Sequence, residues 1–219
     1  MISFMTEAKH DSRLHLVDHP YLLDRLTTLR AVETSPPTFR RQVQFIAQFL
    51  AYEALADTSL GHRVVETPLQ LSKQPCLPET APTLIAILRA GMAMVDGALQ
   101  VSPDSPVGMV GVQRNEETLQ PEPYYLRLPE ALDARLCLVC DPMLATGGSL
   151  CHALEILKAQ GAKRLRVLCL LAAPEGVERV LVAHPDITIW TVALDERLNA
   201  RGYIIPGLGD AGDRIYGMA

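Results

Sequence analysis

From residue 84 onward, short apolar runs alternate with stretches of helical periodicity, and this alternation limits the chain to a few architectures. The apolar runs predict five strands, namely Leu84–Leu88, Val107–Val112, Leu136–Cys140, Leu165–Ala172 and Ile187–Val192. Short buried strands separated by helices form βαβ units, whose strands run parallel. The pattern therefore predicts an α/β fold with a mainly parallel central sheet and flanking helices, and 219 residues suit a single domain over 1–219.

Helical spacing marks the segments between and before these strands. Apolar residues recur on one face over residues 150–157, and Gly161 can close that helix. Residues 174–184 predict a shorter helix that opens with a proline and stops before the next one. Nearer the N-terminus, the spacing over residues 39–54 predicts a helix with Thr38 as its cap.

Three segments do not follow the alternation. Residues 1–20 are polar and irregular, and we interpret them as an N-terminal arm. Residues 115–130 hold three prolines and two tyrosines, which is typical of a projecting loop or β-arm. Residues 202–217 form a glycine-rich tail that is too irregular for a regular element. Together with the N-terminal helix, this tail is expected to form a small hood over the sheet.

Charge and hydropathy argue against several classes of protein. The net charge is −5, from 20 basic and 25 acidic residues, whereas nucleic-acid readers usually carry a basic face, so no nucleic-acid partner is expected. The longest apolar run, Val167–Ala173, is far shorter than the roughly 20 residues of a membrane span, so no membrane association is expected. Residues 1–10 contain no apolar core of a signal peptide, which favours a cytoplasmic protein.

The cysteines and histidines do not suggest a metal site. The five cysteines fall mostly in apolar stretches and are expected as reduced core thiols. Cys137 and Cys140 have the spacing of a zinc half-site, but within a strand their side chains point to opposite faces. His152 is interpreted as a helix-surface or capping residue, and Trp190 as a core residue.

The strongest local signal lies where the strand Leu136–Cys140 ends. It comprises Asp141, Pro142, Met143, Leu144, Ala145, Thr146, Gly147, Gly148 and Ser149. Two glycines let backbone N–H groups approach a ligand, two hydroxyls add donors, and the N-terminus of the following helix favours an anion. This stretch predicts a phosphate cradle, with Asp141 accepting hydrogen bonds from sugar hydroxyls. It lacks the lysine of a Walker loop, so nucleotide hydrolysis is not expected.

Two arginines follow other predicted strands. Arg89 comes directly after Leu84–Leu88, and Arg114 lies just beyond Val107–Val112. The carboxyl ends of parallel strands meet at one edge, where open α/β sheets bind ligands. A guanidinium can bind phosphate oxygens in fork geometry. Together with the phosphate cradle, the two arginines predict a ligand with more than one phosphate.

Residues 207–212 match the residue pattern of the dinucleotide fingerprint G-x-G-x-x-G but not its required sequence context. That fingerprint must precede an acidic residue by about 20 residues, and this chain ends at Ala219. We expect these glycines instead to expose backbone donors and acceptors to a flat ligand.

These segments, in this order, resemble the uracil phosphoribosyltransferase family. The resemblance covers nearly the whole chain, and residues 141–149 and 202–213 are its most specific parts. Most phosphoribosyltransferases begin the phosphate motif with two acidic residues, whereas the second position here is Pro142, as in the uracil enzymes.

The resemblance implies an enzyme of pyrimidine salvage, a pentosyltransferase. It would transfer ribose 5-phosphate from phosphoribosyl diphosphate (PRPP) to N1 of uracil, giving UMP and diphosphate. The resemblance also implies Mg²⁺ held mainly by PRPP and water rather than by protein ligands. It further implies a homodimer or larger homo-oligomer, for which the 115–130 arm is the expected contact. GTP is an expected effector, without an assignable site.

The roles of the family's residues carry over to the matching positions. Arg89 and Arg114 would hold the diphosphate, and Asp141–Ser149 the ribose and the 5′-phosphate. The uracil site would comprise Ile204, Gly209, Asp210 and Ala211. Asp210 would also face PRPP, so the expected catalytic residues are Arg89, Asp141 and Asp210.

One position departs from the family's usual pattern. Asn115 stands where an aspartate commonly follows the arginine, which removes a carboxylate beside the predicted diphosphate site. Three alternatives stay open at this point. They are an RNA-binding regulator that senses UMP or PRPP, a relative that uses xanthine or orotate, and a catalytically silent paralogue.

Overall fold

The chain folds around one central sheet, and the computed structural model describes residues 11–77, 80–114 and 121–218. The strands of this sheet are β1 (Leu14–Leu16), β4 (Thr83–Leu88), β5 (Val107–Arg114), β6 (Pro121–Arg127), β7 (Leu136–Cys140), β8 (Met143–Leu144), β9 (Arg164–Ala172) and β10 (Thr188–Leu194). Their order is β1-β10-β9-β7-β4-β5-β6, with β8 paired to β9. In the described part of this central sheet only β5 and β6 pair antiparallel, so the prediction of a mainly parallel sheet is confirmed.

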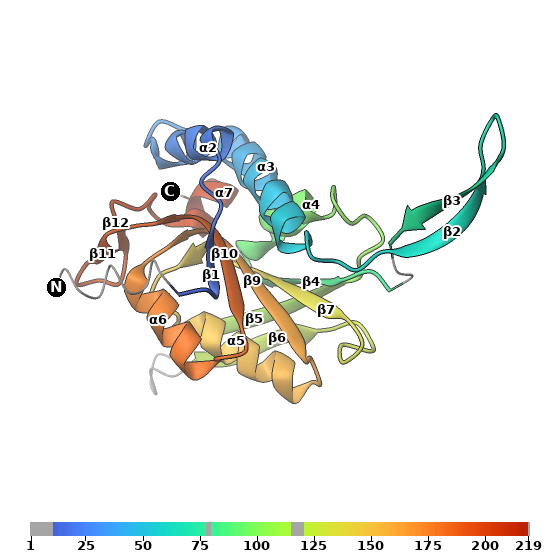
Figure 1. Cartoon of the computed structure of the whole chain (residues 1–219). Coiled ribbons are helices and arrows are strands. Elements are labelled where there is room, and N and C mark those ends of the chain that lie inside the picture. The colour runs from blue at the N-terminus through green and yellow to red at the C-terminus, as the bar shows by residue number, and fades with distance from the viewer. Residues whose placement is uncertain (1–10, 78–79, 115–120, 219) are drawn as a thin grey trace.

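Two hairpins and six helices complete the described structure (Figure 1). The hairpins pair β2 (Gly61–Glu66) with β3 (Leu71–Cys76), and β11 (Arg197–Leu198) with β12 (Ile204–Ile205). The helices are α2 (Pro20–Arg30), α3 (Pro36–Ala54), α4 (Gly91–Ala98), α5 (Gly148–Ala159), α6 (Pro174–Ala183) and α7 (Ala211–Tyr216). No helix in the described ranges is long and apolar enough to cross a membrane.

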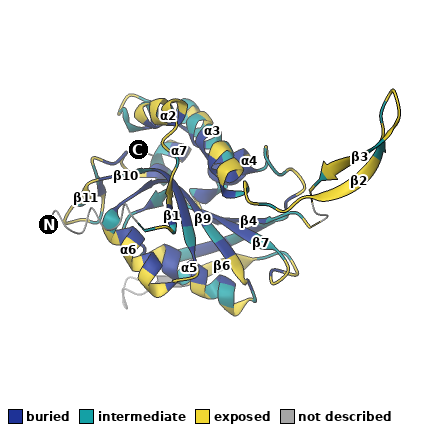
Figure 2. Cartoon of the chain, viewed as in Figure 1, coloured by how far each residue is buried: buried dark blue, intermediate teal, exposed yellow. Residues whose placement is uncertain are grey.

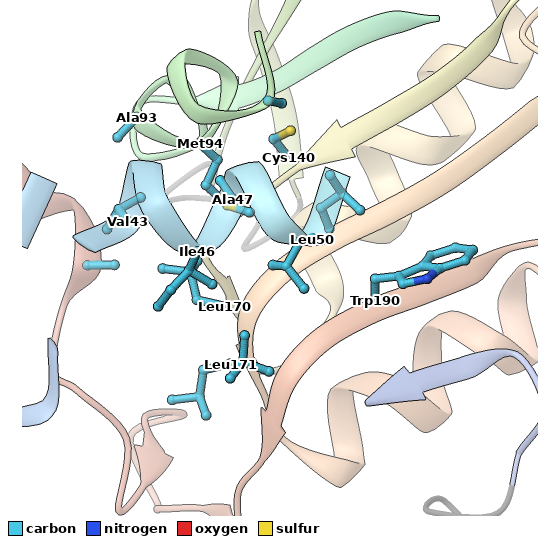
Figure 3. Close-up of a cluster of buried hydrophobic side chains, with 14 of the residues drawn as sticks. Val43, Ile46, Ala47, Leu50, Ala93, Met94, Cys140, Leu170, Leu171 and Trp190 are labelled. Carbon is cyan, nitrogen blue, oxygen red and sulfur yellow. The ribbon is translucent and has the colours of Figure 1, made fainter. Parts of the chain in front are cut away.

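The helices cover both faces of the sheet and enclose two apolar cores (Figure 2). One core lies between the sheet and α2, α3, α4 and α7, and the other lies beneath α5 and α6. In the first core, Ile46 and Leu50 of α3 are fully buried and lie with Met94 of α4 above the sheet residue Leu170 (Figure 3). Because both faces are covered, β4, β7 and β9 are apolar over most of their length; the exceptions are Thr83 at the start of β4 and the two arginines, Arg164 and Arg166, near the start of β9.

All five predicted strands are present as β4, β5, β7, β9 and β10, close to their predicted bounds. The three predicted helices are also present, as α3, α5 and α6. The predicted cap Thr38 is wrong, because α3 begins at Pro36, three residues before the predicted start at residue 39, with Ser35 at the N-cap position. Proline is well suited to the first helical turn, where its missing N–H costs nothing.

The prediction for residues 115–130 is wrong for its described part. Residues 121–127 form β6, which pairs with β5 at the edge of the central sheet; residues 115–120, with Asn115, lie outside the described residues. The element that projects from the body is the β2–β3 hairpin, which the sequence analysis did not identify (Figure 1). Its strands are exposed on nearly every residue, so they show no alternation of apolar and polar positions.

Two further segments are more regular than predicted. Within the predicted arm over residues 1–20, Leu14–Leu16 form β1, which pairs parallel with β10, and α2 begins at Pro20. Residues 1–10 lie outside the described residues. Within the glycine-rich tail, Ile204–Ile205 form β12 and Ala211–Tyr216 form α7, so the expectation of no regular element is wrong.

Candidate active site

A cavity of about 400 Å³ opens at the carboxyl ends of β4, β5 and β7. Its lining residues are Ile87, Leu88, Arg89, Ala90, Val112, Asp141, Pro142, Met143, Ala145, Ser149, Gly202, Tyr203, Ile204, Gly209, Asp210, Ala211 and Gly212. The chain leaves β4 through α4 on one face, and leaves the adjacent β7 through α5 on the other. The loops therefore diverge between these two strands, which is where open α/β sheets leave room for a ligand.

Asp141 follows β7 and is the carboxylate at the floor of this cavity. Its backbone N–H donates to the carbonyl of Leu168 at 3.1 Å, which holds the residue to the neighbouring strand β9. Burial raises the pKa of Asp141 to about 7, and a hydrogen bond from the backbone N–H of Met143 opposes this rise. The carboxyl group therefore holds its proton to a higher pH than an exposed aspartate, and a cationic ligand would favour its charged form.

The predicted phosphate cradle forms the turn into α5. Gly147 adopts a φ of +75° as the N-cap of the helix, a conformation that glycine takes without steric cost. The N–H of Gly148 lies 3.4 Å from the hydroxyl of Thr146. Ser149 lies in the first turn of α5 and lines the cavity. Backbone amides and two hydroxyls thus gather at a helix N-terminus, which is the arrangement that binds anions.

Arg89 lines the cavity from the short connection between β4 and α4. The peptide bond between Leu88 and Arg89 is cis. The Arg89 guanidinium lies 5.9 Å from the ring centre of Tyr216, and its Nη1 lies 3.6 Å from the sulfur of Met218. The Tyr216 hydroxyl donates to the backbone carbonyl of Arg89 at 2.9 Å. The C-terminal helix therefore positions this arginine.

The glycine-rich tail forms part of the cavity wall. Gly207 and Gly209 adopt φ values of +66° and +80°, and a Cβ on Gly207 would approach the carbonyl oxygen of Ile204 to 2.1 Å. Asp210 caps α7 by accepting a hydrogen bond from the N–H of Asp213 at 2.9 Å. This loop presents a backbone edge and one carboxylate to the cavity.

One buried carboxylate joins this loop to the body. Asp195, just after β10, accepts hydrogen bonds from both terminal nitrogens of Arg30 at 2.8 and 2.6 Å. The same carboxylate accepts a bond from the N–H of Gly207 at 2.8 Å, and Arg30 also donates to the Gly207 carbonyl at 2.7 Å. The end of α2, the end of β10 and the tail loop therefore meet at one ion pair.

Two further arginines hold the tail to the N-terminal helices. Arg214 of α7 donates to the carbonyls of Leu29, Ala31 and Leu208, and its guanidinium lies 4.6 Å from the ring centre of Phe39. Arg40 of α3 donates to the carbonyl of Ile215 at 2.7 Å. The carbonyls of Leu29, Ala31 and Ile215 lie near the C-terminal ends of α2 and α7, where the helices leave carbonyls free, and that of Leu208 lies in the tail loop.

The structure brings together most of the predicted site residues. Those that line the cavity are Arg89, Asp141, Pro142, Met143, Ala145, Ser149, Ile204, Gly209, Asp210 and Ala211. Leu144, Thr146, Gly147 and Gly148 belong to the cradle but are not lining residues. Arg114 ends β5 at the same edge of the sheet, and its side chain lies outside the described residues.

Sequence reasoning missed several residues of this site. Val112 and Tyr203 line the cavity, and Arg30 and Asp195 hold its upper loop. Neighbours such as Ala90 and Gly212 could have been found by extending the motifs by one residue. Asp195 carries no such signal, because nothing in its sequence surroundings indicates a partner 165 residues away.

The Asp195 ion pair generates the first prediction. Asp195→Asn would leave the Arg30 guanidinium without its counter-charge, which should lower the free energy of unfolding by about 2–4 kcal/mol. Hydrogen exchange at the amides of residues 207–211 should accelerate, because the loop loses its attachment. Urea unfolding and exchange mass spectrometry measure both effects.

The matched control is Glu196→Gln, the same change at the neighbouring exposed carboxylate, which pairs with Arg197 at 3.1 Å. This variant should change stability by less than about 0.5 kcal/mol. An Asp195→Asn variant as stable as this control would contradict the assigned role.

Comparison with known proteins supports a single family. The family model described as uracil phosphoribosyltransferase matches residues 16–218. The uracil phosphoribosyltransferase of Paracoccus denitrificans is 50% identical over 213 residues, covering 97% of this chain and 99% of its own. The uracil phosphoribosyltransferase of Enterococcus faecalis is 48% identical over 205 residues, which cover 94% of this chain and 98% of the relative.

Solved structures agree with this result. A protein of Aquifex aeolicus superposes with a TM-score of 0.88 at 39% identity, covering 94% of this chain and 99% of its own. A hypoxanthine-guanine phosphoribosyltransferase of Bacillus anthracis superposes with a TM-score of 0.50 at 14% identity, over 73% of this chain and 80% of its own. This similarity shows a shared fold. Because the family model spans nearly the whole chain, the chain belongs to the uracil phosphoribosyltransferase family.

Proposed function

We propose that this cavity carries out the reaction of the family, the transfer of ribose 5-phosphate from PRPP to N1 of uracil, with UMP and diphosphate as products. The main support is one observation: the carboxylate of Asp141, the phosphate cradle, Arg89 and the backbone edge of the tail border a single cavity. The curated relatives carry the name of this enzyme and lend no support to a sensor or a silent paralogue.

The charges around the cavity suit this reaction. As the bond from C1 to diphosphate breaks, positive charge develops on the ribose ring and negative charge on the leaving group. An ionised Asp141 would stabilise the ring, and Arg89 would stabilise the diphosphate. Arg114 would join Arg89 there, and residues 145–149 would hold the 5′-phosphate. Fixing uracil N1 beside C1 would supply proximity, so no side-chain nucleophile is needed.

Selectivity for uracil would come from the backbone edge between Ile204 and Ala211. Uracil presents an N3–H donor and a C4 carbonyl acceptor, whereas cytosine reverses both roles. A loop held by the Asp195 ion pair cannot easily rearrange, so cytosine would leave buried polar groups unpaired. Asp210, which lies in this edge, would also face the ribose of PRPP.

The protein atoms of the site suit Mg²⁺ that arrives on PRPP. Among the residues that the structure describes, no group of three or more His, Cys, Asp or Glu side chains could hold a metal by itself. Asp141 and Asp210 are the carboxylates that line the cavity, and they would face a Mg²⁺ held by the diphosphate and water. The bound ion would offset the negative charge of the leaving group. Activation by GTP stays a prediction from the resemblance, without assigned residues.

A homo-oligomer would cover the projecting β2–β3 hairpin. A two-stranded hairpin is marginal in water, yet this one exposes apolar side chains along its length. They include Leu60, Val64, Leu69, Leu71 and Leu77, of which Leu69 is 94% exposed. Surfaces of this kind mark protein contacts, so a second copy of the chain is the proposed partner.

The reaction itself is the second prediction. The protein with PRPP, Mg²⁺ and uracil should form UMP, whereas cytosine, orotate and xanthine should give less than about a hundredth of that rate. Asp141→Asn should lower the rate at least about a hundredfold, because the ribose loses its facing charge. Chromatographic detection of UMP measures both. PRPP binding without turnover of any base would favour the sensor or the silent paralogue.

The raised pKa of Asp141 leads to the third prediction. The carboxyl group of Asp141 binds its proton more tightly in the folded protein than in the unfolded chain. Proton binding therefore adds to the free energy of unfolding, fully below about pH 4, and this contribution is lost as pH rises through about 7. The free energy of unfolding of Asp141→Asn, minus that of the parent, should therefore increase between pH 4 and pH 8, by at most about 4 kcal/mol. Thermal unfolding without ligands tests this. The exposed Asp104→Asn serves as control, and an equal pH trend in both variants would contradict the prediction.

The oligomer leads to the fourth prediction. Val64→Glu with Leu71→Glu should convert the assembly to monomers in light-scattering measurements, because charges would be buried at the contact. Val32→Glu, at a residue that is 92% exposed in the turn before α3, should leave the mass unchanged. A parent protein that is monomeric at tens of micromolar would contradict the proposed contact.

A further inference from the structure

Helix α6 packs directly on the phosphate cradle, although the two are separate in sequence. A Cβ on Gly176 would lie 2.1 Å from the carbonyl oxygen of Ala145, so only glycine permits this approach. A Cβ on Gly147 would lie 2.9 Å from the carbonyl oxygen of Gly176 and 3.3 Å from a methyl group of Val180. The residues of α6 at positions 176 and 180 therefore face the cradle, and position 179 lies between them on the same face.

Arg179 occupies that position, and its guanidinium lies at the cradle. Its Nη1 is 3.5 Å from the backbone carbonyl oxygen of Thr146. A methyl group added to Gly148 would lie 3.5 Å from the same Nη1 and 3.7 Å from the Thr146 hydroxyl. The guanidinium and the hydroxyl thus both lie beside the position that a Cβ of Gly148 would occupy, and the N–H of Gly148 is one of the cradle donors.

No carboxylate of the described residues lies within ion-pair distance of Arg179. The first turn of α5 contains no acidic residue. A cation near the positive end of a helix is unfavourable, and one hydrogen bond of 3.5 Å offsets little of that cost. A bound dianion would interact favourably with the guanidinium and with the helix end together.

We propose that Arg179 is a phosphate-binding residue, which adds a positive charge to the subsite for the 5′-phosphate of PRPP and UMP. This inference rests on the proposed function, because that function assigns the 5′-phosphate to the cradle. The guanidinium would form a charge-assisted hydrogen bond to a phosphate oxygen, beside the backbone amides of Gly148 and Ser149. It would act on binding of the phosphate and leave the diphosphate side of the cavity unaffected.

Arg179→Gln removes the positive charge, and its shorter side chain also gives up the weak 3.5 Å hydrogen bond to the Thr146 carbonyl. The dissociation constant of UMP, measured by calorimetry, should increase at least about tenfold, while that of diphosphate stays within about twofold. In turnover, KM for PRPP should increase similarly, with kcat and KM for uracil nearly unchanged. Arg179→Lys should recover most of the UMP affinity, because it restores the charge.

The matched control is Lys163→Gln, which removes one positive charge just beyond the opposite end of α5. It should leave the UMP affinity unchanged.

If Arg179→Gln bound UMP as tightly as the parent, or lost affinity for UMP and diphosphate equally, Arg179 would have no specific role at the phosphate. If the parent bound UMP but did not turn over uracil, the proposed reaction would fail while the role of Arg179 could still be decided from the affinities. A parent that bound no UMP would overturn both.

Discussion

The carboxylate of Asp195 is the interaction on which the upper half of the pocket depends. It accepts three hydrogen bonds, two from Arg30 and one from the N–H of Gly207, and it is almost fully buried. Removing one partner of such a cluster leaves the other charge without compensation, which costs far more than an exposed pair contributes. The tail is rich in glycine and would otherwise be mobile, so this ion pair and the bonds of Arg214 give it one conformation.

The lower half of the pocket depends on the order of the strands. β4 and β7 are neighbours, although β5 and β6 lie between them in sequence. Their following helices lie on opposite faces of the sheet, so the loop with Arg89 and the loop with Asp141 diverge and leave a crevice. The two predicted anion sites therefore face one cavity, and the tail forms part of its wall.

Most of the sheet could be predicted from the sequence, because strands that are covered on both faces must be apolar throughout. The strands at the two edges of the sheet could not be predicted in this way. β6 begins at Pro121 and carries Pro123, and β1 spans only three residues, so neither shows a clear strand pattern. Proline is tolerated there because an edge strand pairs on one side only. The β2–β3 hairpin is exposed on both faces and lacks an apolar alternation.

The sequence by itself determined the class of fold, the strands of its core and the phosphate cradle, because these follow from local apolar spacing and from glycines beside a helix start. The tertiary structure decided how distant segments meet. It joined Arg30, Asp195 and Gly207 across the fold, and it set Arg179 against Gly148. Such contacts depend on the order of strands and on close approaches between backbones, and no local pattern of residues encodes either.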